Sequence, residues 1–146
     1  MTYPLLLTLH LFAALVFIGT VFFEVLFMAP IQKRLPDEAR QALARHLGPR
    51  VRAVMPWVLL VLFSAGLGMA WHHREALAHP AGSAFGTLLL LKITLATSVL
   101  IHVITAMTLM RRRRLSGLAR DRIHKSVFCH MVGIVVLAKA LFYVSW

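Results

Sequence analysis

Four long apolar stretches alternate with polar segments along the 146 residues of the chain. We expect membrane spans over about residues 4–28, 55–71, 85–110 and 126–146, the first ending before Ala29-Pro30. A helix rises about 1.5 Å per residue, so about 20 residues cross a hydrocarbon layer of about 30 Å. The pattern predicts an all-α membrane protein whose single domain, residues 1–146, is a four-transmembrane-helix bundle.

Composition and charge support a membrane location. Sixty per cent of the residues are hydrophobic, and the net charge is +11. Thirteen of the sixteen Lys and Arg lie in two segments, six between Lys33 and Arg52 and seven between Arg111 and Lys125. By the positive-inside rule these two loops are cytoplasmic and both termini lie on the outer, periplasmic side. We therefore expect a multi-pass protein of a bacterial inner membrane, with membrane lipid and no nucleic acid as partner.

The polar segments between spans predict little further structure. Pro36-Asp37-Glu38 resembles a helix start, and we expect a short surface helix over about residues 37–47 that ends at Gly48-Pro49. Residues 72–82 are expected to form a short hydrophilic turn, whose three histidines we interpret as interfacial groups and not as metal ligands. No internal repeat or extramembrane domain is visible.

Ionisable residues inside the spans indicate a site, because charges at mid-bilayer are costly and usually face a bundle interior. The third span holds Lys92 and His102. At about 100° per residue, Thr94, Ser98, Thr105 and His102 form one polar stripe, with Lys92 at its border.

The first and last spans add further ionisable residues. His10 and Glu24 lie within about 40° of the same face of the first span. The fourth span holds Cys129, His130 and Lys139. Histidine is the common axial ligand of haem b, and bundles build cofactor sites from facing helices. We expect haem binding to depend on His102, while its partner, His10 or His130, stays open because helix boundaries are uncertain by several residues.

The order of these features resembles the copper-resistance-D (CopD) superfamily, and within it the HemJ-type protoporphyrinogen oxidases. The matching pieces are His10 in LHLFAALVFIGTVFF, a proline opening the second span after Arg50-Val-Arg52, Lys92 ten residues before His102, and Lys139 in VVLAKALFY. The family pattern has an aromatic residue where this sequence has Ile101 and a proline where it has Ala140. His130 has no counterpart in the pattern.

The resemblance implies a haem b membrane oxidoreductase that oxidises a porphyrinogen or a quinol and passes electrons to the quinone pool. His10 and Lys92 match the family positions linked to activity. We expect Lys92 to act on substrate or protons, with Glu24 as a second catalytic candidate and Lys139 among the cofactor-binding candidates. A homo-oligomer is left open.

Two other classes of function remain open. Seven methionines and eight histidines suit copper handling, since thioether and imidazole are copper ligands. However, Cys129, His130 and Met131 are consecutive and point about 100° apart on a helix, so they cannot converge on one copper ion. The second alternative is a non-catalytic assembly subunit without a cofactor.

Overall fold

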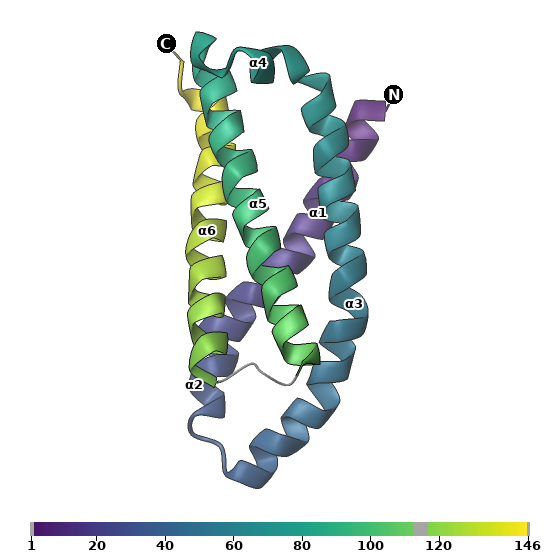
Figure 1. The fold of residues 1–146 in the computed structure, drawn as a ribbon, viewed down its shortest axis with the longest axis vertical. Coiled ribbons are helices and arrows are strands. Elements are labelled where there is room, and N and C mark those ends of the chain that lie inside the picture. The colour runs from purple at the N-terminus through teal and green to yellow at the C-terminus, as the bar shows by residue number, and fades with distance from the viewer. Residues whose placement is uncertain (1, 113–116, 146) are drawn as a thin grey trace. The chain divides into compact units, whose positions relative to one another are not determined.

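A computed structural model describes residues 2–112 and 117–145, and every element in this part of the chain is helical (Figure 1). The chain divides into two compact units, Met1–His72 and His73–Trp146. Among the described residues, four helices are long and apolar enough to cross a membrane: Thr2–Gln32, Asp37–His72, Ala84–Met110 and Asp121–Tyr143. The predicted all-helical class with four apolar helices is confirmed.

The first span continues past the proline at which we expected it to end. Helix α1 (Thr2–Phe23) runs through a π-helical turn, η1 (Glu24–Met28), into α2 (Ala29–Gln32). Pro30 has no N–H, and its ring crowds the carbonyl four residues earlier. The N–H of Ala29 bonds the Glu24 carbonyl, five residues back. The wider turn thus absorbs the proline without ending the helix.

Helix α3 (Asp37–His72) is one helix of 36 residues, so the predicted short helix ending at Gly48-Pro49 is wrong. A proline removes one backbone hydrogen bond but keeps a helical φ, and the helix continues through both Pro49 and Pro56. Its length of about 54 Å exceeds the hydrocarbon layer. Figure 1 shows the first part of α3, which carries the arginines, at an angle to the rest.

Helices α1 and α3 form an antiparallel hairpin in the first unit. Ala13 and Phe17 on α1 and Leu59 and Ala65 on α3 are buried. A Cβ added to Gly68 would lie 2.9 Å from Cδ1 of Leu6. The two helices therefore approach closely where α3 has no side chain.

The second unit begins with a helical link. The expected turn at residues 72–82 contains a short helix, α4 (Arg74–Ala78), and a 3₁₀ turn, η2 (Pro80–Gly82). Helix α5 (Ala84–Arg111) is capped by Ser83, whose side chain accepts from the N–H of Gly86. A Cβ on Gly86 would lie 2.8 Å from the Ala76 carbonyl oxygen and 3.0 Å from that of Pro80. The glycine lets the link fold onto α5.

Helix α6 (Gly117–Tyr143) starts nine residues before the position 126 at which we expected the last span. The expected end at Trp146, and Arg113 and Arg114 of the basic loop, lie outside the described residues. Helices α5 and α6 form a second antiparallel hairpin with Val99, Val127 and Met131 buried. A Cβ on Gly133 would lie 3.2 Å from Cδ1 of Leu95, which sets the close approach of the two helices.

Large apolar side chains cover the outside of both hairpins. Leu15 is 70% exposed, Leu67 70% and Phe142 83%. A monomeric soluble protein rarely exposes contiguous apolar surface on this scale. These exposed side chains are those that a membrane helix presents to lipid or to a neighbouring helix.

Candidate functional site: the membrane histidines

His10 is held on α1 by two features of α3. Its Nδ1 lies 2.9 Å from the carbonyl oxygen of Leu62. A carbonyl oxygen can only accept, so Nδ1 carries the hydrogen and the lone pair is on Nε2. A Cβ at position 66 would lie 3.2 Å from Cε1 and 3.3 Å from Nδ1 of His10. Gly66 thus makes room for the imidazole.

His102 and His130 are oriented by their own helices in the same way. The Nδ1 of His102 is 2.7 Å from the carbonyl oxygen of Ser98, and the Nδ1 of His130 is 2.7 Å from that of Ser126. In each case the histidine donates to the residue four positions earlier. Both imidazoles therefore carry their lone pair on Nε2.

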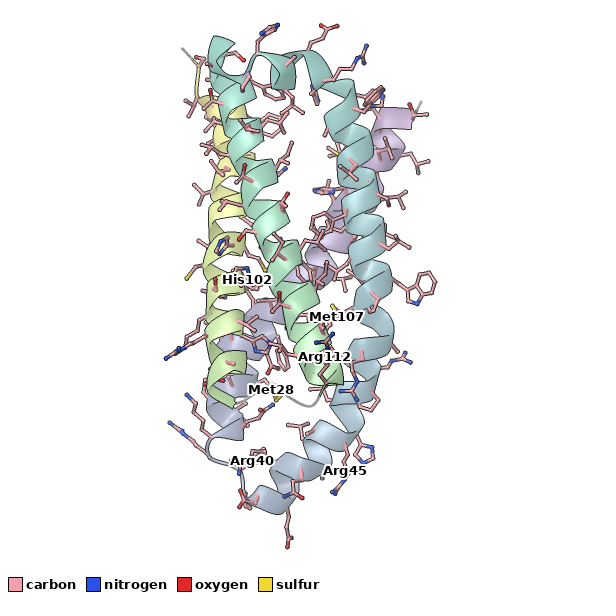
Figure 2. The ribbon with its side chains drawn as sticks, viewed as in Figure 1. Met28, Arg40, Arg45, His102, Met107 and Arg112 are labelled. Atoms are coloured by element: carbon pink, nitrogen blue, oxygen red, sulfur yellow. The ribbon has the colours of Figure 1, made fainter. Side chains whose placement is uncertain are left out.

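Across the hairpin the same four residues bond crosswise. The Ser126 hydroxyl lies 3.1 Å from Nε2 of His102, and the Ser98 hydroxyl lies 3.1 Å from Nε2 of His130. Since each Nε2 must accept, each hydroxyl donates. The ring centres are 5.4 Å apart with planes at 48°. Figure 2 labels His102 and shows its ring on α5 beside α6. We call Ser98, His102, Ser126 and His130 the Ser–His cluster.

The cluster arises from a short repeat that our reading of the sequence missed. The segments SVLIH (residues 98–102) and SVFCH (residues 126–130) share Ser-Val-x-x-His. Val99 and Val127 occupy equivalent buried positions, 2% and 3% exposed. Because α5 and α6 are antiparallel, each serine lies level with the histidine of the other segment. The repeat was the signal that could have predicted this pairing, and with it Ser126.

In the Ser–His cluster, the two nitrogens that would ligate one haem are already hydrogen-bonded. Ligands on opposite sides of an iron must aim their coordinating nitrogens at each other from about 4 Å apart. Here Nε2 of His102 points to α6 and Nε2 of His130 points to α5, and each accepts from a serine. Binding one iron between the two rings would break both of these hydrogen bonds.

The other predicted site residues lie away from these histidines along their helices. Lys92 is half-buried and lies about 9 Å along the helix from Ser98. Among the described residues, none forms a hydrogen bond or an ion pair with its side chain. Lys139 is exposed. Glu24 is half-buried at the start of η1, about 21 Å along the helix from His10. The structure does not bring Glu24 and His10 together.

The predicted polar stripe on α5 divides in the structure. Ser98 and His102 face α6, whereas Thr94 and Thr105 are exposed. The Thr94 hydroxyl donates to the Leu90 carbonyl of its own helix at 2.9 Å. The interface is thus narrower than the stripe, and only the middle of the stripe takes part in it.

No three His, Cys, Asp or Glu side chains are grouped to hold a metal ion among residues 2–112 and 117–145. His72 and His79 are exposed. On α6, Cys129 is exposed while Met131 is buried, so these neighbours of His130 point in different directions.

Comparison with protein-family models, with curated proteins and with solved structures gave no match to this chain. The class that the fold defines is an all-helical chain with four apolar helices able to cross a membrane, among the residues described.

Proposed function

We propose that this chain is an integral membrane oxidoreductase that binds haem b through His10. The observation that carries the proposal is the setting of the His10 imidazole. A metal-ligating histidine usually donates one ring N–H to a backbone carbonyl, which fixes the tautomer and orients the ring. His10 donates to Leu62 in this way, and Gly66 provides the space for its ring.

His10 would hold the haem through Nε2, and the haem would supply one-electron chemistry whose potential depends on its protein ligand and the hydrogen bonds to that ligand. The hydrogen bond from Nδ1 to Leu62 increases the basicity of Nε2 as an iron ligand. The resemblance to HemJ-type oxidases supports the same assignment, since His10 matches a position linked to activity. We leave the second axial position unassigned and do not include His102 or His130 in the haem site.

Lys92 is the residue that we assign to substrate. Its ammonium is half-buried in a candidate span and has no anionic partner among the described residues. A lysine in this setting attracts the carboxylate of a porphyrinogen or hydrogen-bonds a quinol oxygen. Both substrates release protons together with electrons. The neutral amine form of Lys92 can receive such a proton, whereas the ammonium form attracts the carboxylate, so the two roles use different protonation states of the side chain. Glu24 and Lys139 remain weaker candidates.

The proposed location is a bacterial inner membrane with the two basic segments on the cytoplasmic side. The charge distribution supports this orientation, because Lys33 to Arg52 and Arg111 to Lys125 hold most of the basic residues. Electrons from the substrate pass to the quinone pool of the same membrane.

The absorption spectrum of the purified protein tests the haem assignment. We expect a Soret band with about one haem per chain, and we expect His10→Ala to lose most of it. His72→Ala is the matched control, because His72 also bonds a carbonyl of α3 but is exposed near the end of the helix. A wild-type protein without haem, or a His10→Ala variant with the wild-type spectrum, would overturn the proposal.

The role of Lys92 has its own test. Lys92→Met keeps the length of the side chain but removes its charge. We expect normal haem content and a loss of at least about tenfold in the rate at which a porphyrinogen or quinol reduces the haem, the effect of one charge-assisted hydrogen bond. Lys33→Met, at an exposed lysine directly after α2, is the control. An unchanged reduction rate in Lys92→Met would remove Lys92 from the substrate site.

A further inference from the structure

We infer that the Ser–His cluster binds one proton inside the membrane and shares it between His102 and His130. The inference goes beyond the haem proposal, because it concerns the second unit and does not involve His10. It rests on the crossed hydrogen bonds and on the chemistry of the four groups that make them.

All four side chains of the cluster have complete partners in the neutral state. His102 and His130 each donate from Nδ1 to a backbone carbonyl at 2.7 Å and each accept at Nε2 from a serine 3.1 Å away. All four residues lie within the candidate spans Ala84–Met110 and Asp121–Tyr143. Polar groups inside a membrane need such partners, because lipid offers none.

A proton can be added to either ring without leaving a hydrogen bond unmade. The proton binds the Nε2 lone pair, and the hydrogen bond from the facing serine to that nitrogen breaks. The hydroxyl then rotates, so that its oxygen accepts from the new N–H. Its own hydrogen turns to the carbonyl four residues earlier in its helix, as the hydroxyls of Thr94 and Thr97 already do at 2.9 Å. The four side chains, together with one further backbone carbonyl, thus satisfy the charged state.

The cluster takes one proton and not two. The ring centres are only 5.4 Å apart, and two imidazolium ions at that distance in an apolar interface repel each other strongly. The two rings have matching hydrogen-bond partners, since each has a carbonyl of its own helix and a facing serine, with a buried valine one residue after that serine. A single proton is therefore shared nearly equally.

Few other charged or titratable groups lie near the cluster on the two helices that form it. On α6 the nearest in sequence are His124, Lys125 and Cys129, of which Lys125 and Cys129 are exposed. On α5 the nearest is Lys92, six residues before Ser98. His124 is half-buried and lies two residues before Ser126, but the crossed hydrogen bonds join only the four residues of the cluster, so we assign the proton to His102 and His130.

Nitrogen-15 spectra of histidine-labelled protein in lipid discs test this inference. The label distinguishes protonated from unprotonated ring nitrogens, and His102→Gln and His130→Gln assign the signals. As the pH is lowered, we expect the wild-type chain to take up one proton on the pair, divided about equally between the rings.

Two reciprocal variants give the sharpest result. Ser98→Ala removes the acceptor for a charged His130. The ratio of protonated His102 to protonated His130 should therefore rise by about tenfold, the effect of one charge-assisted hydrogen bond. Ser126→Ala should lower that ratio by the same factor, because it removes the acceptor for a charged His102. Ser98→Thr keeps the hydroxyl and should keep the equal division. Ser64→Ala is the control, because its hydroxyl donates to Leu60 on the exposed side of α3.

Three results would overturn the inference. Both rings staying neutral in the wild-type chain, for as long as it stays folded, would show that the cluster only holds α5 to α6. Two protons bound independently would contradict sharing, and a division that does not follow the serines would contradict their role. The wild-type measurement decides the first two even if the alanine variants do not fold. A sample without a Soret band that shares one proton would overturn only the haem proposal.

Discussion

The two hairpins use membrane histidines in different ways. In the first unit, a single histidine, His10, is held by a backbone carbonyl and lies against a glycine of the facing helix. In the second unit, two histidines are held by carbonyls of their own helices and bonded crosswise by serines. All three share one tautomer, and in the second hairpin a serine hydroxyl of the facing helix donates to each Nε2 as well.

The difference shows that the orienting bond of a histidine does not define its role. Donation from Nδ1 to a carbonyl prepares Nε2 to act as an acceptor. The facing side chain then decides the use of that lone pair. Gly66 leaves room for the ring of His10, whereas Ser126 and Ser98 bring a hydroxyl to each of the other rings.

The largest effect on stability is expected at a glycine of the second hairpin. A Cβ in Gly86→Ala would lie 2.8 Å from one backbone carbonyl oxygen and 3.0 Å from another, and backbone cannot rotate away. We expect a loss of about 1–3 kcal/mol, measured by unfolding in detergent. In Gly68→Ala of the first hairpin the close atom is the flexible end of Leu6, so its loss should be much smaller. Equal losses would contradict this account of the two contacts.

The crossed bonds predict a specific pattern of coupling. A double-mutant cycle of Ser98→Ala with His130→Ala should give a coupling free energy of about 0.6–1.7 kcal/mol, the range for hydrogen bonds between membrane helices. Ser126→Ala with His102→Ala should give a similar value. Ser98→Ala with His102→Ala should couple less, because His102 bonds the backbone of Ser98 and not its hydroxyl. Stronger coupling within one helix than across the two would disprove the crossed arrangement.

Gly66→Ala is expected to act on His10 more than on stability. The new Cβ would lie 3.2 Å from the ring, so the imidazole must shift by a few tenths of an ångström. Helix propensity favours alanine over glycine by about 1 kcal/mol. This gain offsets the cost of displacing the ring, so the unfolding free energy should change little. We expect a shifted Soret band or a reduced haem content instead. A wild-type spectrum would indicate that the position of the His10 ring does not matter to the haem.

The smallest effects should come from hydroxyls that bond only their own helix. Thr94→Val removes a hydroxyl that donates to Leu90 on an exposed face of α5. We expect the unfolding free energy to change by less than about 0.5 kcal/mol. A larger loss would show that Thr94 has a partner outside the chain, such as a second copy or another subunit.

The sequence predicted the four apolar helices because twenty-residue apolar stretches leave few alternatives. Helix ends were predicted less well, because a proline in the sequence does not show whether the helix ends there or continues. The structure continues the helix through a π-helical turn at Glu24 and through Pro49 in α3. His10, His102 and His130 were predicted as site residues from their cost in lipid. Their partners were not, because Leu62 contributes a backbone atom, Gly66 contributes space, and Ser126 required recognising the SVxxH repeat.

The central claim is that His10 and the Ser–His cluster have separate roles, and haem content tests it most directly. Soret absorbance per chain should be compared in the wild type, in His10→Ala, and in the double variant Ser98→Ala/Ser126→Ala, with folding checked by circular dichroism. We predict that His10→Ala loses most of the haem and that the double serine variant keeps it. Loss of haem from the serine variant together with full haem in His10→Ala would contradict the account.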